Sequence, residues 1–143
     1  MTNLRHATLT WSHQMVFSGG ETGGPSIPID GDGAAGPSPM LLLLLAAGSC
    51  TGSDIVSILE KMRVELRSLA IDVTGTRREE HPRRYLALHL RFRLSGAGLD
   101  QAKAQRAIEL SLEKYCSVVH TLAPDLAVTH ELVRHRPCSF LQE

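Results

Sequence analysis

Two cysteines in apolar helical segments are the residues of this chain best suited to do chemistry. Cys50 ends the stretch "LLLLLAAGSC", and Cys116 lies in the later stretch "LEKYCSVVH". An ionised thiol can act as a nucleophile, exchange with a disulfide or bind a metal. Because both segments are apolar enough to pack into one core, the two thiols could meet there and form a redox pair.

Two other interpretations of these thiols stay open. A buried free cysteine often serves only as a small apolar side chain. Cys116 and His120 are also four residues apart, with His130 and His135 following, which resembles half of a zinc site. A zinc site of paired ligands needs two convincing pairs, so we predict neither a bound metal nor another cofactor.

Small side chains surround the first thiol. They are Gly48, Ser49, Thr51, Gly52 and Ser53. Side chains of this size allow a close approach of neighbouring backbone and leave space beside the sulfur, so we expect a small pocket there. The sequence lacks the Gly-x-Ser-x-Gly elbow of acyl-transfer enzymes and the glycine patterns of nucleotide-binding loops.

The length and charge of the chain narrow the class of protein. Its 143 residues fit a single domain, 1–143, whose tail from about residue 136 we expect to be flexible. Fifteen basic residues balance fifteen acidic ones, so no nucleic-acid or anionic membrane partner is indicated. The apolar run 40–47 is shorter than the roughly 20 residues that cross a bilayer. Three cysteines do not make an even disulfide framework, and we expect a cytoplasmic location.

The elements before Cys50 follow from periodicity and turn residues. Residues 7–17 alternate with period two, with His13 in the apolar row, and predict a strand or a hairpin bent near Ser12. The following segment is rich in Gly and Pro and has room for a short strand at 26–30. A helix is predicted from Ser38 to about Arg67, with its leucine run buried on all sides.

The elements after this helix predict an α+β fold. Residues 67–77 and 84–94 alternate as a long hairpin with one wet face, its buried row beginning at Leu86. Asp100 can cap a second helix that reaches Cys116 and carries Tyr115 on its apolar stripe. Residues 127–134 read as a last strand. We therefore predict an antiparallel sheet packed against a buried central helix and a second helix. Cys138 falls in the tail as an exposed free thiol.

Three stretches carry a resemblance to a known family. "FSGGETGGPSIPIDG", "GPSPMLLLLLAAGSCTGSDIVSILEKMR" and "LEKYCSVVHTLAPD" follow one another in an order that resembles the OsmC/Ohr family of thiol-dependent hydroperoxide reductases, over roughly residues 9–134. The central motif, Ser38-Pro39-Met40 followed by Cys50, Thr51-Gly52 and Asp54, looks like the OsmC-like branch.

The resemblance implies an assembly and a reaction. The assembly is an intertwined homodimer of α+β subunits, with each thiol pair near the subunit interface. In the reaction, Cys50 attacks an organic hydroperoxide, Cys116 condenses with the resulting sulfenic acid, and a cellular dithiol reduces the disulfide. The implied catalytic residues are therefore Cys50 and Cys116.

Two activating residues of the family have no counterpart here. Peroxidases of the family carry a glutamate at the start of the central helix, where this chain has Met40 and Leu41. They also carry an arginine in an N-terminal loop, whereas residues 7–20 contain none and His13 is the nearest candidate. We therefore expect peroxidase activity weaker or narrower than that of the family's best enzymes. The alternative is a non-enzymatic dimer that binds a small hydrophobic ligand in the pocket.

Overall fold

The computed structural model describes residues 3–133, which fall into two compact units that divide between residues 43 and 44. The predicted single domain stays a prediction. The predicted tail from about residue 136, with Cys138, lies outside the described residues.

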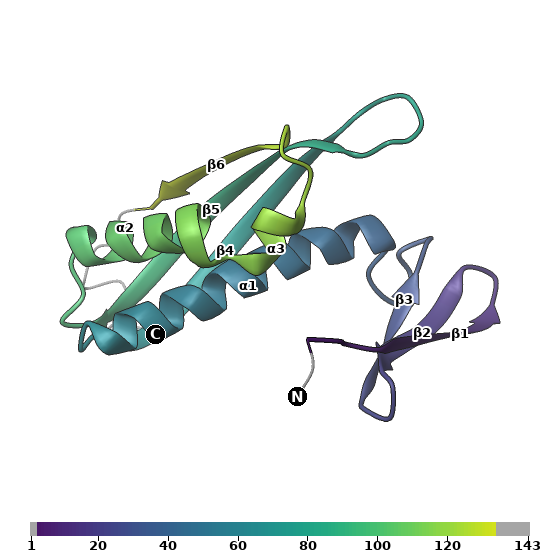
Figure 1. Ribbon diagram of the computed structural model, residues 1–143, viewed down its shortest axis with the longest axis horizontal. Helices are drawn as coiled ribbons and strands as arrows, with labels where there is room; N and C mark the ends of the chain where they lie inside the picture. Colours follow the sequence, from purple (N-terminus) through teal and green to yellow (C-terminus); the bar gives the residue numbers. More distant parts are fainter. Residues whose placement is uncertain (1–2, 134–143) are drawn as a thin grey trace. The chain divides into compact units, whose positions relative to one another are not determined.

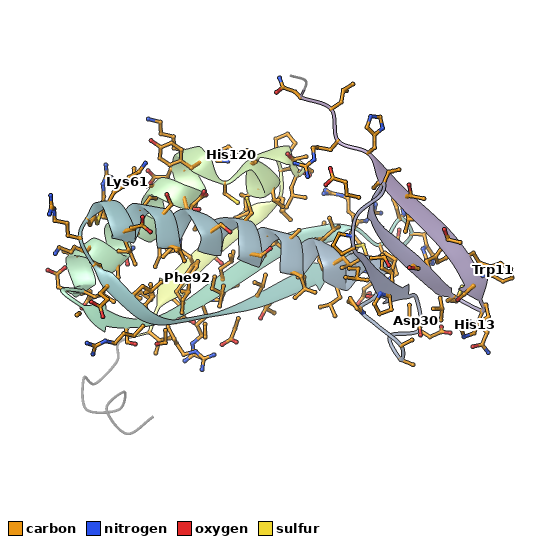
Figure 2. The ribbon with its side chains drawn as sticks, turned by 90° about the horizontal axis from the view of Figure 1, so that it is seen from below. Trp11, His13, Asp30, Lys61, Phe92 and His120 are labelled. Carbon is orange, nitrogen blue, oxygen red and sulfur yellow. The ribbon has the colours of Figure 1, made fainter. Side chains whose placement is uncertain are left out.

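The first unit contains a three-stranded antiparallel sheet (Figure 1). Its strands, in spatial order, are β1 (Ala7–His13), β2 (Val16–Glu21) and β3 (Ser26–Asp30). The bend predicted near Ser12 is confirmed as the β1–β2 turn, where the Trp11 indole N–H donates to the carbonyl of Gln14 at 2.8 Å. The apolar row of this hairpin is exposed, and Trp11 lies at its end (Figure 2).

The long helix α1 (Pro39–Lys61) starts where the sequence predicts. The Ser38 hydroxyl accepts the N–H of Leu41 at 3.2 Å, which confirms Ser38 as the cap. The helix ends earlier than predicted, because Arg63 adopts a left-handed conformation with φ of 63° and a strand begins at Glu65.

The leucine run of α1 is not buried on all sides, so that prediction is wrong. Leu41, Leu43 and Leu45 are 44%, 38% and 52% exposed. A helix that lies on one layer of other elements buries only the side that faces them. The buried side chains of α1 begin at Ala47, one turn before Cys50.

The second unit contains a mixed sheet of β4 (Glu65–Arg77), β5 (Tyr85–Ala97) and β6 (Ala127–Leu132). β4 and β5 form the predicted antiparallel hairpin, whereas β6 lies parallel to β5. Between β5 and β6 the chain forms α2 (Gln101–Leu110), a π turn (Ser111–Tyr115) and α3 (Ser117–Thr121). This helical crossover returns the chain in the direction of β5, which is why β6 pairs in parallel. The α+β class is confirmed.

The core of the second unit lies between the sheet and the helices α1 and α2, which cover one sheet face (Figure 1). Phe92 is fully buried there (Figure 2), whereas Leu86, predicted to begin the buried row, is 41% exposed. The other sheet face is wet, as predicted, and carries ion pairs such as Arg93 with Asp72 at 3.1 Å. The Asp100 carboxylate caps α2 by accepting the N–H of Lys103 at 2.8 Å.

Candidate functional site

Cys50 is held at the rim of the face that α1 packs into the second unit. Gly48 and Gly52 lie against β4, where an added Cβ would come within 3.0 Å of Val73 and Ile71 side-chain carbons respectively. These glycines let the helix approach the sheet closely. Cys50, between them in sequence, is partly exposed and is a free thiol.

Cys116 sits where the π turn ends. Its N–H donates to the carbonyl of Ser111 at 2.8 Å, the bond across five residues that defines a π turn. Its own backbone is extended, with φ of −70° and ψ of 101°, and its side chain is fully buried. The thiol is also free. The second helical segment therefore reaches Cys116, as predicted, but through a π turn.

The structure brings the two predicted site residues together. The Cys116 sulfur accepts a hydrogen bond from the Thr51 hydroxyl at 3.3 Å and one from the Val119 N–H at 3.5 Å. The Cys50 thiol lies close enough to the same sulfur to affect its protonation. A partly exposed thiol thus lies beside a fully buried one.

Burial decides the protonation of Cys116. Removal from water raises the pKa of the Cys116 thiol, and the neighbouring Cys50 raises it further. Hydrogen bonds from Thr51 and Val119 favour the thiolate and oppose this rise without cancelling it. At neutral pH Cys116 is therefore a protonated thiol.

A second side-chain bond joins α1 to the segment that carries Cys116. The Ser111 hydroxyl, fully buried, donates to a carboxylate oxygen of the half-buried Asp54 at 2.8 Å. Sequence reasoning missed the contact roles of Thr51, Asp54 and Ser111. The available signal was the spacing of Thr51 and Asp54, three residues apart on one helix face beside Cys50.

Of the histidines singled out for a zinc site, His120 and His130 have other contacts, whereas His135 lies outside the described residues. The two ring nitrogens of His120 lie 2.8 Å from the carbonyl oxygen of Cys116 and 3.2 Å from that of Glu113. Within residues 3–133, no three His, Cys, Asp or Glu side chains are grouped so that they could hold a metal.

His13 belongs to the first unit and is exposed (Figure 2), with its Nδ1 2.9 Å from the Ser12 hydroxyl. It lies near Asp30, whose carboxylate accepts backbone N–H groups of Ala35 and Asp32, both at 2.9 Å. These bonds, foremost that of Ala35, lower the pKa of Asp30, and the His13 charge adds to the effect.

The start of α1 lacks the acidic residue that family peroxidases carry. No Asp or Glu occurs in its first turn, where Met40 and Leu41 stand. The helix as a whole is long and apolar enough to cross a membrane by length and composition, a test that core helices of soluble proteins also pass.

Comparison with known proteins agrees with these features. The family model described as OsmC-like protein matches residues 30–131, which include both Cys50 and Cys116. Protein YhfA of Escherichia coli strain K12 is 40% identical over 125 residues, covering 87% of this chain and 93% of YhfA.

Solved structures show the same fold. A hypothetical protein from Aquifex aeolicus VF5 is 30% identical, with a TM-score of 0.80 over 94% of this chain and all of that one. The organic hydroperoxide resistance protein OhrB of Bacillus subtilis shares the fold at 16% identity, with a TM-score of 0.61 over 91% of this chain and 98% of OhrB. Proteins of this family are typically soluble. The chain belongs to the OsmC-like protein family.

Proposed function

We propose that this protein is a thiol-dependent peroxidase that reduces organic hydroperoxides through a Cys50–Cys116 disulfide cycle. The observation that carries this proposal is the pairing of a partly exposed thiol with a buried one across two helical segments. The name of the OhrB neighbour, an organic hydroperoxide resistance protein, supports the same substrate class.

The difference in exposure supports a division of roles between the two thiols. Cys50, the thiol that solvent reaches, attacks the terminal peroxide oxygen as a thiolate. The O–O bond breaks, the substrate leaves as an alcohol after taking a proton, and Cys50 becomes a sulfenic acid. Cys116 then attacks the Cys50 sulfur, water leaves, and a disulfide forms. The raised pKa of Cys116 keeps it protonated in the reduced protein, so it does not compete with Cys50 for peroxide.

The cycle closes when a cellular dithiol supplies two electrons and becomes a disulfide itself. We propose a cytoplasmic location, where such dithiols are kept reduced. Because the first turn of α1 has no acidic residue and β1 and β2 have no arginine, we expect slower turnover than in the family's best peroxidases.

We also propose that the protein acts as a homodimer. The observation behind this is the apolar surface that a single chain leaves open. Leu41, Leu43 and Leu45 on α1, and Leu9 and Trp11 on β1, are each 38% to 61% exposed. Exposed large apolar side chains that gather on one helix or strand support an interface, and a second copy is the partner that the family resemblance implies.

The same exposed leucines favour one other function, a non-enzymatic dimer that binds a small hydrophobic ligand. Native mass spectrometry after gentle purification tests it. A co-purified lipid or fatty acid would support the binder, and a protein without bound ligand would count against it.

The peroxidase is tested by intact mass and thiol count after one equivalent of cumene hydroperoxide, with Cys138→Ser as the background. We expect the Cys50/Cys116 protein to lose about 2 Da and both thiols. Cys116→Ser should instead gain about 16 Da as a sulfenic acid, and Cys50→Ser should not react. Unchanged mass in all three proteins would refute the proposal.

A further inference from the structure

The buried sulfur of Cys116 makes the reductive half of the proposed cycle directional. A reducing dithiol approaches from solvent, and of the two sulfurs only that of Cys50 is partly exposed, whereas Cys116 is fully buried. Attack on the disulfide therefore falls on the Cys50 sulfur, and Cys116 departs with the electron pair of the broken S–S bond.

This leaving group forms in an unfavourable place. A thiolate released at Cys116 is surrounded by core, and burial is the largest influence on its protonation. Thiol–disulfide exchange is faster when the leaving thiolate is better stabilised. The groups that contact the Cys116 sulfur thus control how fast the disulfide is reduced.

We propose that Thr51 is a catalytic residue of the reductive half-cycle, whose hydroxyl donates a hydrogen bond to the Cys116 thiolate as that thiolate leaves the disulfide. The inference rests on the proposed disulfide cycle and assigns to one side chain a step within it. Its basis is the 3.3 Å contact of the Thr51 hydroxyl with the Cys116 sulfur in the reduced protein, which is the product of this step. Thr51 is itself fully buried, so water does not compete for the bond.

The step balances as follows. One thiolate of the dithiol forms a bond to the Cys50 sulfur, the Cys50–Cys116 bond breaks, and Cys116 leaves as a thiolate that Thr51 and the Val119 N–H stabilise. The second thiol of the reductant then attacks its own mixed-disulfide sulfur and releases Cys50 as a thiolate. The two thiol protons of the dithiol end on the cysteines, through solvent, and the dithiol ends as a disulfide.

The reaction of Cys50 with peroxide should not depend on Thr51 in the same way. The Cys50 sulfur is the nucleophile in that step, and Cys116 carries no charge until it attacks the sulfenic acid. The hydroxyl of Thr51 contacts the Cys116 sulfur, so its removal acts where Cys116 carries charge. A loss in disulfide reduction without a loss in the peroxide step is the signature that separates this role from general damage to the core.

The test compares Thr51→Val, Thr51→Ser and wild type, all with Cys138→Ser. Ser53→Ala is the matched control, because the Ser53 hydroxyl bonds the exposed Ser49 carbonyl at 2.8 Å on the same helix. Each disulfide is formed with diamide, so that failure with hydroperoxide is recorded separately as failure of the proposed function. Reduction by dithiothreitol is followed by stopped flow, and the Cys116 thiolate is titrated by its absorbance in Cys50→Ser variants.

We expect Thr51→Val to slow disulfide reduction roughly tenfold, the size of one hydrogen bond to a charged group, with little change in the rate of Cys50 oxidation by hydroperoxide. Thr51→Ser should restore the rate, Ser53→Ala should leave it unchanged, and the Cys116 titration should move to higher pH in Thr51→Val. Equal reduction rates for Thr51→Val and wild type would overturn the inference. So would a Thr51→Ser protein as slow as Thr51→Val, or failure of diamide to form the Cys50–Cys116 disulfide.

Discussion

The hydrogen bond between Ser111 and Asp54 should be measurable as an energetic coupling between α1 and the segment that carries Cys116. We consider Asp54→Ala, Ser111→Ala and the double variant. The bond is 2.8 Å long, its donor is fully buried and its acceptor is a carboxylate. Hydrogen bonds to charged groups contribute about 1.5–3 kcal/mol, and water at the half-buried Asp54 lowers that value, so we expect a coupling of about 1–2 kcal/mol.

The individual variants should differ in a defined way. Asp54→Ala leaves the buried Ser111 hydroxyl without its acceptor, which costs about 1–3 kcal/mol, whereas Ser111→Ala leaves a carboxylate that water can still reach. Asp54→Ala should therefore destabilise more. It should also slow closure of the Cys50–Cys116 disulfide by diamide, because the bond fixes the turn that ends at Cys116.

Urea unfolding at one fixed protein concentration measures the coupling, since a dimer's stability depends on concentration. The control cycle is Arg5 with Glu21, an exposed ion pair at 3.0 Å whose coupling should be within about 0.5 kcal/mol of zero. A Ser111–Asp54 coupling no larger than that of the control would refute the reasoning. Unchanged disulfide closure in Asp54→Ala would refute the link to the thiol pair.

Three further results are expected. Burial raises the pKa of Cys116 above its unfolded value, so the stability that the protonated thiol contributes is complete below the unfolded pKa and is lost as pH rises through the folded pKa. In urea unfolding from pH 7 to 10, the free energy of unfolding should therefore fall less in Cys116→Ala than in wild type. An equal fall in both proteins would contradict this. Phe92→Ala should cost about 3–5 kcal/mol in the same assay because Phe92 is fully buried, whereas Leu86→Ala, 41% exposed, should cost much less. Backbone hydrogen bonds lower the pKa of Asp30 in the folded protein, so the stability that they contribute should be lost as pH falls through the folded pKa. The fluorescence of Trp11, the chain's single tryptophan, should therefore change with acid in wild type and not in Asp30→Asn.

Local signals explain the parts of the fold that could be predicted. Ser38 and Asp100 cap helices because a side-chain oxygen accepts an N–H three residues later, and both caps are visible in sequence. The direction of β6 depends instead on how the whole crossover from 98 to 126 returns to the sheet. The exposure of Leu41 and Leu43 depends on which surfaces surround the helix, which hydrophobicity alone does not specify.

The residues of the site also fall into two groups, those that the sequence indicates and those that only the fold brings together. Cys50 and Cys116 were identified by residue type, and the family pattern paired them. The contacts of Thr51 with Cys116 and of Asp54 with Ser111 join residues far apart in the sequence, so they depend on how α1 lies beside the second helical segment. Spacing within either segment does not contain that information.

The π turn Ser111–Tyr115 holds one residue more than an α-helical turn and so changes which of the following side chains faces the core. An uninterrupted α-helix would place Tyr115 on the buried stripe of Ala104 and Ile108, but Tyr115 is 50% exposed and Cys116 is fully buried. Because of the additional residue in the turn, the Cys116 thiol and not the Tyr115 ring occupies the core position. Deleting the exposed Glu113 would let a regular α-helix place the Cys116 thiol in the core. A regular α-helix with every residue present would bury the Tyr115 ring there instead.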